Sequence, residues 1–195
     1  MFSEPYNTDR GWIEVICGSM FSGKTEELLR RLRRVQIRQQ LLVTAKPAQD
    51  TRWEPNTISS RTGASIPAKP FTQSTELLTL AKDTQVLAID EAQFADSTLP
   101  QVVQTLSAKP MRIILCGLDM DFTGKPFGPM PQLLAIANHI LKVHALCHNC
   151  GYQAVYSYRS DPSTNTILLG DKDSYKPLCR DCWNTLPNTK QLNKP

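Results

Sequence analysis

The segment GSMFSGKT, Gly18 to Thr25, constrains the fold of this chain more than any other. It matches the pattern G-x-x-x-x-G-K-[ST] in full, an apolar run (WIEVIC, 12–17) precedes it, and leucines at helical spacing follow it. Glycines in such a loop let successive backbone N–H groups point into one concavity that can hold phosphate oxygens. We therefore predict a nucleoside triphosphate site, with Lys24 near the β- and γ-phosphates and the Thr25 hydroxyl on Mg²⁺.

Further apolar runs of strand length occupy 41–46, 86–90 and 112–118, and helical patterns such as STELLTLAK and STLPQVVQTLSA separate them. This alternation is typical of a parallel sheet covered by helices, so we predict an α/β fold of the P-loop, RecA-like type. The segments 47–71 and 119–131 are rich in Pro, Gly, Ser and Thr and follow strands. Ligand loops of open α/β sheets lie at that edge.

The chain changes character near Leu146, where short strand patterns, turn residues and four cysteines begin. A chain of 195 residues has room for one well-buried core and a small appended module. We predict an ATP-binding α/β domain over 1–146, a cysteine-containing domain over 147–186 and a disordered tail over 187–195.

Charge and hydropathy exclude several classes of protein. No apolar run approaches the roughly 18 residues of a membrane span, and the polar start MFSEPYNTDR does not resemble a secretion signal, so we expect a soluble, cytoplasmic protein. Nucleotide phosphates would suit the net charge of +4 as well as nucleic acid would. A solvated or subunit-facing side is favoured over polynucleotide contact for the basic helix that carries Arg30, Arg31, Arg33, Arg34 and Arg38.

Two adjacent acids end the run VLAIDEAQF. Asp90 occupies the position where P-loop proteins hold Mg²⁺ through water. Glu91 could accept a proton from a hydroxyl that attacks the γ-phosphate, or it could activate water in an ATPase. The motif alone leaves these two roles open.

Four of the six cysteines form two CxxC turns, Cys147-x2-Cys150 and Cys179-x2-Cys182. This arrangement is typical of a four-thiolate structural Zn²⁺ site, and disulfide or redox chemistry is the weaker alternative in a reducing compartment. Cys17 and Cys116 lie in apolar runs and are expected to be free, buried thiols. The chain between the two turns is rich in tyrosine and could cover an aromatic base.

These motifs together resemble one family, the zinc-containing thymidine kinases, which are distinct from the herpesvirus-like deoxynucleoside kinases. The resemblance runs from about Trp12 to Trp183 through GSMFSGKT, KPAQDTRW, SSRTGASIPAK, IDEAQF, GLDMDFTGKPFG, CHNC, LLGDKDSYKPLC and CRDCW. It implies transfer of the γ-phosphate of Mg²⁺-bound ATP to the 5′-hydroxyl of thymidine or deoxyuridine, in pyrimidine salvage for DNA synthesis.

The resemblance also implies roles for individual residues. Glu91 matches the general base, and Asp50 and Arg52 match polar residues around the phosphates and the sugar 5′-end, with Arg52 a catalytic cation. The expected ATP-binding set is Gly18, Ser19, Met20, Phe21, Ser22, Gly23, Lys24, Thr25, Asp90, Glu91, Ala92 and Gln93.

On the nucleoside side, Met20 and Leu118 match the apolar pocket around the thymine methyl group. Phe94 and Phe122 match aromatic residues beside the nucleoside, although the sequence alone would favour core packing for both. The remaining expected contacts are Ser157, the segment Thr166, Ile167, Leu168, Leu169 and Gly170, and Tyr175. The chain departs from the family at Gly170-Asp171, where a pair of glycines is usual.

The resemblance further implies a homotetramer that thymidine triphosphate inhibits, with no nucleic-acid or membrane partner. The competing hypothesis from another class is an ATP-driven nucleic-acid-binding protein. The zinc module lacks a positively charged stripe, which argues against that alternative.

Overall fold

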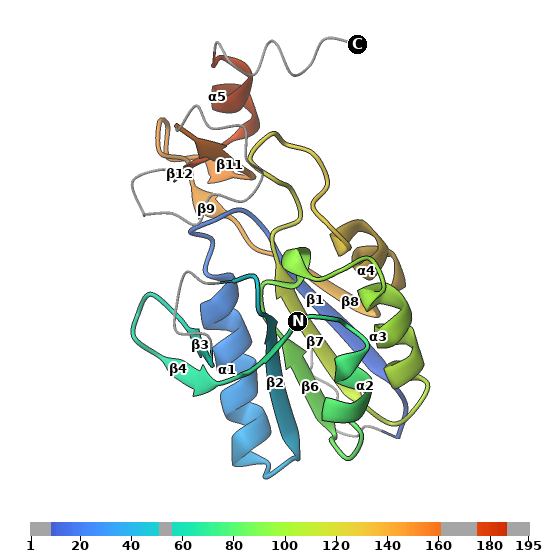
Figure 1. Ribbon diagram of the computed structural model, residues 1–195. Helices are drawn as coiled ribbons and strands as arrows, with labels where there is room; N and C mark the ends of the chain where they lie inside the picture. The colour runs from blue at the N-terminus through green and yellow to red at the C-terminus, as the bar shows by residue number, and fades with distance from the viewer. Residues whose placement is uncertain (1–8, 51–55, 161–174, 187–195) are drawn as a thin grey trace.

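The computed structural model describes residues 9–50, 56–160 and 175–186, and a six-stranded sheet forms its centre (Figure 1). The strand order is β5-β2-β6-β7-β1-β8, and every neighbouring pair is parallel. The strands are β1 (Trp12–Cys17), β2 (Leu42–Pro47), β5 (Lys69–Phe71), β6 (Val86–Ile89), β7 (Arg112–Gly117) and β8 (His139–Lys142). The predicted parallel α/β fold is confirmed.

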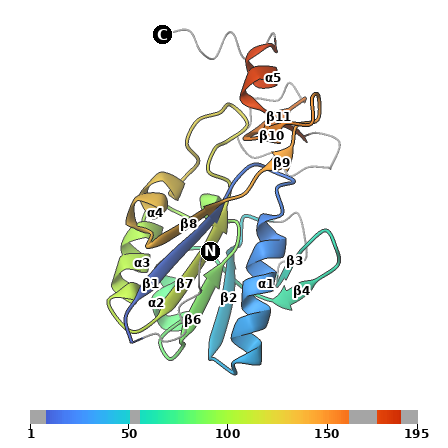
Figure 2. The ribbon, with the colours of Figure 1, turned by 180° about the vertical axis from the view of Figure 1, so that it is seen from behind.

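Helices cover both faces of the sheet because its central strands are apolar on both sides. Helix α1 (Lys24–Ile37) lies on one face, and α2 (Glu76–Leu80), α3 (Leu99–Ser107) and α4 (Met130–Ile136) lie on the other, as Figure 2 shows. Alternate residues of β1 divide between the two layers. Val15 packs with α2, α3 and α4, whereas Ile16 packs with the Leu28 and Leu32 side of α1.

The segment between β2 and α2, expected to be a loop, contains more regular structure than its composition indicates. Strands β3 (Thr57–Ser59) and β4 (Ser65–Pro67) form an antiparallel hairpin beside α1, and β5 then joins the edge of the main sheet. Ile58 of this hairpin is buried in the α1 layer, which fixes the hairpin against that helix. Its tip consequently lies near the start of α1.

A buried ion cluster fixes the middle of α1 to the sheet. Glu14 of β1 is fully buried and accepts hydrogen bonds from Arg31 of α1 and from Arg112 of β7, the latter at 2.7 and 3.0 Å. Arg31 also donates to Glu27 at 2.8 Å. The expectation that the arginines of this helix share one exposed or subunit-facing side is therefore wrong for Arg31, because that side chain neutralises a carboxylate inside the domain.

The last described segments, 145–160 and 175–186, form a small body that we call the cysteine module. It contains the antiparallel pairs β9 (Ala145–Leu146) with β10 (Gln153–Ala154) and β11 (Tyr156–Arg159) with β12 (Tyr175–Leu178), followed by α5 (Arg180–Asn184). Figure 1 places it beyond the carboxyl ends of β1 and β8, with α5 outermost. Within the described residues, no helix combines the length and apolar character needed to cross a bilayer.

Candidate active site

The phosphate loop joins β1 to α1 and has the backbone that its glycines predict. Gly18 and Gly23 have φ of 141° and 82°, and Phe21 between them has φ of 66°. A Cβ atom on Gly18 would lie 2.0 Å from the Val143 carbonyl oxygen, so this position has no room for a side chain. Because Gly23 precedes the first residue of α1, the loop ends at a helix N-terminus, where backbone N–H groups can bind an anion.

Lys24 lies across this loop. Its ammonium group donates to the Ser19 carbonyl oxygen at 2.8 Å, and the Ser22 hydroxyl donates to the same oxygen at 2.7 Å. The Lys24 side chain is largely buried. A cation in such a place can bind phosphate oxygens that enter the loop.

Asp90 follows β6 and approaches the start of α1. The Thr25 hydroxyl donates to its carboxylate at 3.4 Å. Burial, and after it the negative charge of Glu91, raise the pKa of Asp90 to about 7. Burial and the charge of Asp90 also raise the pKa of the Cys116 thiol well above its ordinary value, so this thiol stays protonated beside the carboxylate. Cys116 and Cys17 are free and buried, as predicted.

Glu91 occupies an unusual backbone conformation for a residue with a side chain, with φ of 52° and ψ of 38°. Its N–H donates to the Asp90 carboxylate at 3.0 Å, and the short 3-10 helix η1 (Ala92–Phe94) begins directly after it. A left-handed residue other than glycine costs roughly 1–2 kcal/mol, and strain of this kind concentrates at functional sites. The turn directs the two adjacent acids to different surroundings, since Asp90 is buried and Glu91 lines a cavity.

The cavity has a volume of about 260 Å³. The phosphate loop from Met20 to Thr25 lines it, together with Glu91 and Leu118. Met20 and Leu118, both expected around the thymine methyl group, thus line the same cavity. Its further lining residues are Glu26, Ser59, Ser60 and Arg61.

The hairpin tip at 59–61 was not among the predicted site residues, although the motif SSRTGASIPAK contains it. The guanidinium of Arg61 lies 4.0 Å from the ring centroid of Phe21, which is cation–π distance. This contact joins the tip of the hairpin to the phosphate loop. No local spacing signals it, because the packing of Ile58 and its neighbours against α1 brings this hairpin to the loop from a distant part of the sequence.

Several residues predicted to bind the nucleoside belong to the phosphate loop or to the cysteine module, and some of them are in contact. The Met20 N–H donates to the Ser157 hydroxyl at 2.9 Å, which joins two of the predicted residues directly. Arg159 stacks on the ring of Phe122 at 3.6 Å, and Tyr175 is paired with Arg159 at the start of β12. Phe94 and Phe122, the two aromatic residues predicted beside the nucleoside, are both only partly buried.

Phe94 and Asp50 are two further residues predicted in the site, and each contacts a different neighbour. The Phe94 ring meets Phe127 edge-on, with the centroids 5.5 Å apart. Asp50 is buried and accepts a hydrogen bond from the Lys46 ammonium at 3.4 Å, an ion pair at the carboxyl end of β2. Arg52 and the segment 166–170 were also predicted to contact the ligands, and both lie outside the described residues.

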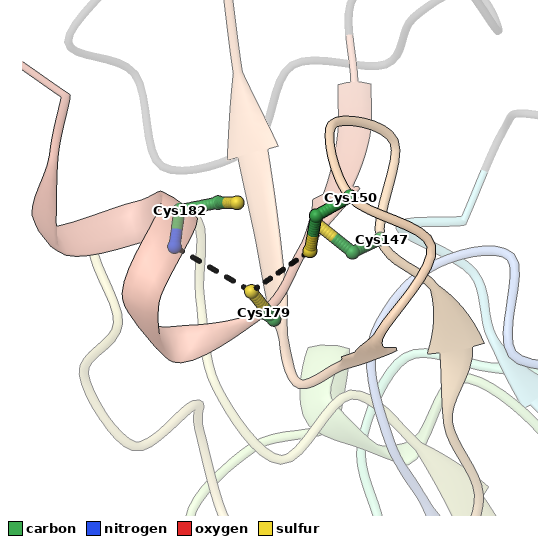
Figure 3. A group of neighbouring side chains, drawn as sticks. All are labelled: Cys147, Cys150, Cys179 and Cys182. Carbon is green, nitrogen blue, oxygen red and sulfur yellow. Dashed lines mark hydrogen bonds between the residues drawn. The ribbon is translucent and has the colours of Figure 1, made fainter.

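The two CxxC turns bring their thiols together in the cysteine module (Figure 3). The sulfur atoms of Cys147, Cys150, Cys179 and Cys182 all lie within 4.8 Å of one another and could hold a metal ion. Sulfurs bound tetrahedrally at about 2.3 Å from Zn²⁺ would be about 3.8 Å apart. The Cys150 and Cys179 sulfurs are separated by 3.6 Å, so the cluster already has nearly the dimensions that this ion needs.

Backbone amides also prepare the cluster for a cation. Burial by itself would raise the pKa of the Cys147 thiol, but backbone N–H groups, first those of Cys179 and Cys150, lower it to about 6. The N–H of Cys182 donates to the Cys179 sulfur at 3.5 Å. These donors favour the thiolate at Cys147, the form that binds a metal. The backbone N–H of Tyr152 would lower the pKa of Cys150, but hydrogen bonds with the neighbouring thiols instead raise it, and they raise the pKa of Cys182 to about 12.

Comparison with known proteins agrees with this geometry. A family model described as "Thymidine kinase" matches residues 11–183. The chain is 47% identical to the thymidine kinase of Bacteroides thetaiotaomicron over 94% of each chain, and 46% identical to that of Porphyromonas gingivalis over 94% of this chain and 92% of the other. It is 45% identical to the thymidine kinase of Rhodothermus sp. over 89% of this chain and 81% of the other.

Proposed function

The chain belongs to the thymidine kinase family, and from that premise we propose that it transfers the γ-phosphate of ATP to the 5′-hydroxyl of thymidine. The observation that carries the proposal is the cavity on which Met20, Lys24 and Glu91 meet. An apolar side chain, a phosphate-binding cation and a candidate base are the groups that a nucleoside kinase needs side by side.

In the proposed reaction, Glu91 accepts the proton of the 5′-hydroxyl as the oxygen attacks the γ-phosphorus. The bond to the β–γ bridging oxygen breaks, and ADP leaves with the electron pair. Lys24 and the N–H groups of the phosphate loop hold the triphosphate, since they converge at the start of α1. Arg52 is proposed as a further cation, and Asp50 as a contact near the sugar 5′-end.

Two metal ions are proposed. Thr25 and Asp90 offer the hard oxygen ligands that Mg²⁺ prefers, 3.4 Å apart, and Mg²⁺ would neutralise phosphate charge. The four thiols offer a closed sulfur shell to a structural Zn²⁺. That ion would hold the module whose Ser157 contacts Met20.

Deoxyuridine is proposed as a second substrate. Met20 and Leu118 are apolar, and an apolar pocket gains only about 1–3 kcal/mol from one methyl group. The backbone of residues 166–170 is proposed to bind the edge of the base, beside Phe94, Phe122, Ser157 and Tyr175. Deoxycytidine should be a poor substrate, because its amino group would meet backbone groups arranged for a carbonyl.

Three further features are proposed from membership of the family: inhibition by thymidine triphosphate, a homotetramer, and a cytoplasmic role in pyrimidine salvage. Light scattering of the purified protein tests the tetramer. Inhibition is tested by adding thymidine triphosphate to the kinase assay.

The activity is tested by measuring ADP release from Mg²⁺-ATP in the presence of thymidine, deoxyuridine, deoxycytidine or single-stranded DNA. We expect stimulation by the first two alone. Stimulation by DNA alone would replace the kinase with an ATP-driven nucleic-acid-binding protein.

The role of Glu91 is tested by Glu91→Gln, which keeps the size of the side chain and removes the base. We expect kcat to fall by about 10²- to 10⁴-fold, because that is the usual contribution of a general base, while ATP binding persists. The matched control is Glu26→Gln, since Glu26 lines the same cavity and should not carry the reacting proton. Equal losses in both variants would remove Glu91 from the role.

A further inference from the structure

Gln93 lies two residues after the candidate base, and both ends of its side-chain amide are bound inside the protein. Its Nε2 donates to the Glu91 carboxylate at 2.5 Å, and its Oε1 accepts from the Leu118 N–H at 2.9 Å. Only 2% of Gln93 is exposed, so the amide connects the η1 turn to the end of β7 within the interior. Although the family resemblance predicts Gln93 to be an ATP-binding residue, it is not among the residues that line the cavity.

The orientation of the amide follows from its neighbours. A backbone N–H can only donate, so the atom that faces Leu118 must be the carbonyl oxygen. The NH₂ group is therefore directed at Glu91, where an ionised carboxylate can only accept. The opposite orientation would place two donors together at one end and two acceptors at the other.

The space around Gln93 is kept free by two glycines. A Cβ atom on Gly117 would lie 2.6 Å from the Gln93 Oε1 atom, and one on Gly128 would lie 2.2 Å from the Gln93 carbonyl oxygen. Gly128 also has a φ of 49°, which disfavours any side chain there. Two separate segments thus approach this residue closely, one at its side-chain amide and one at its backbone.

We infer that Gln93 is a positioning residue, whose amide holds the Glu91 carboxylate in the orientation needed to accept the nucleoside proton. The inference rests on the proposed function. Glu91 projects from a left-handed turn into the cavity, and its side chain needs an anchor there if the carboxylate is to keep one orientation. The anchor extends from the rigid end of β7, which is fully buried, through Gln93 to Glu91.

Gln93→Glu tests the NH₂ donor alone, because it changes little else in the side chain. The glutamate keeps the length of the side chain and an acceptor for the Leu118 N–H, but it places a second carboxylate against Glu91. We expect kcat to fall by about 10- to 100-fold, the scale of a misplaced reacting group, with the KM for Mg²⁺-ATP nearly unchanged. Gln104→Glu, on the exposed side of α3, is the matched control and should leave kcat unchanged.

A double-mutant cycle distinguishes positioning from a purely structural role. Gln93→Glu in the Glu91→Gln background should change kcat by no more than about twofold, because residues that act through one group are not additive. If the substitution lowers kcat by the same factor in both backgrounds, or has no effect in the wild type, the inference is wrong. Should Gln93→Glu fail to fold, Gln93→Met is uncharged and carries the same cycle.

The same assay separates this inference from the proposed function. A wild-type protein without thymidine-dependent turnover would remove both. A wild-type kinase whose Gln93 variants show no coupling to Glu91 would remove the inference alone.

Discussion

The phosphate loop and the cysteine module meet at Met20, but different forces hold them. The phosphate loop leaves β1, whose residues from Ile13 to Cys17 are buried between two helical layers. The cysteine module has only short strands and the five-residue α5, with a core centred on Trp183, which stacks on Tyr156 at 4.6 Å. Burial of apolar surface fixes the first region, whereas the second is too small to rely on it.

This difference indicates that the binding of ATP and the binding of the nucleoside depend on different parts of the fold. The phosphate loop should keep its shape as long as the parallel sheet is intact. The cysteine module needs an additional restraint, and four converging thiols are suited to supply it through a metal. Substitutions in the two regions should therefore separate ATP binding from nucleoside binding.

The largest effect is expected from breaking the thiol cluster with Cys179→Ser. Structural zinc contributes on the order of 10 kcal/mol in small zinc domains, so removing one ligand should disorder the module. We expect the KM for thymidine to rise more than a hundredfold while Mg²⁺-ATP binding, measured by titration, persists. Cys17→Ala is the control, because Cys17 is a thiol in the sheet. Parallel loss of both ligands would mean that the cluster supports the whole fold.

The opposite result, loss of ATP binding, is expected from Gly18→Ala. The new methyl group would meet the Val143 carbonyl oxygen, in a backbone conformation that alanine avoids. A loss of about 2–4 kcal/mol in unfolding free energy and of most ATP affinity should follow, measured by denaturant titration and nucleotide binding. Gly63→Ala is the matched control, since Gly63 has a φ of 89° but open space around it. If both substitutions cost the same, the contact with Val143 does not matter.

A smaller effect is expected from a change of pH, and it should be confined to the region of the phosphate loop and Asp90. The pKa of Asp90 is raised to about 7, so the carboxylate takes up a proton as the pH falls below 7. Mg²⁺ affinity should then weaken by up to about tenfold per pH unit, because the metal needs the ionised form. The raised pKa also means that the folded protein binds this proton more tightly than the unfolded chain, so acidification from pH 7 towards 4 should stabilise the metal-free protein through Asp90.

Asp90→Asn is the control for both effects. The variant should bind Mg²⁺ weakly at every pH and lose this part of the pH dependence of stability. An unchanged profile in Asp90→Asn would assign the titration to another group.

The smallest effect is expected at the junction of the two regions. Ser157→Ala removes the acceptor of the Met20 N–H, and a hydrogen bond of this kind contributes about 0.5–1.5 kcal/mol. The KM for thymidine should rise about two- to tenfold with little change in ATP affinity. Ser65→Ala, on the exposed face of β4, should do neither. A wild-type KM in Ser157→Ala would show that the junction does not depend on this bond.

Local patterns predicted the parallel sheet and several of its boundaries. The run 12–17 is β1, and the run 112–118 differs from β7 by one residue. They did not predict β8 or the short strands β3 to β5. Residues of β8 alternate between half-buried and exposed, and this strand pairs with β1 from the other end of the sequence. Strand order depends on such distant pairings, which no window of sequence contains.

The same limit applies to the candidate site. The phosphate loop, the adjacent acids and the CxxC turns are local spacings, so sequence alone identifies them. The contacts of Met20 with Ser157, of Phe21 with Arg61 and of Gln93 with Leu118 join distant segments. Burial of Arg31 was missed for the same reason, because one of its two carboxylate partners, Glu14, is on a strand and not on its own helix.

The position of β1 has a consequence for how the chain acquires its structure during synthesis. β1 emerges first, yet its two neighbours are β7, at 112–117, and β8, at 139–142. Until β7 has left the ribosome this apolar strand has no partner on either edge, and until β8 has left it one edge stays open; nascent chains in this condition are prone to aggregate. The phosphate loop, which directly follows β1, therefore takes its final shape only after these much later strands have joined the sheet.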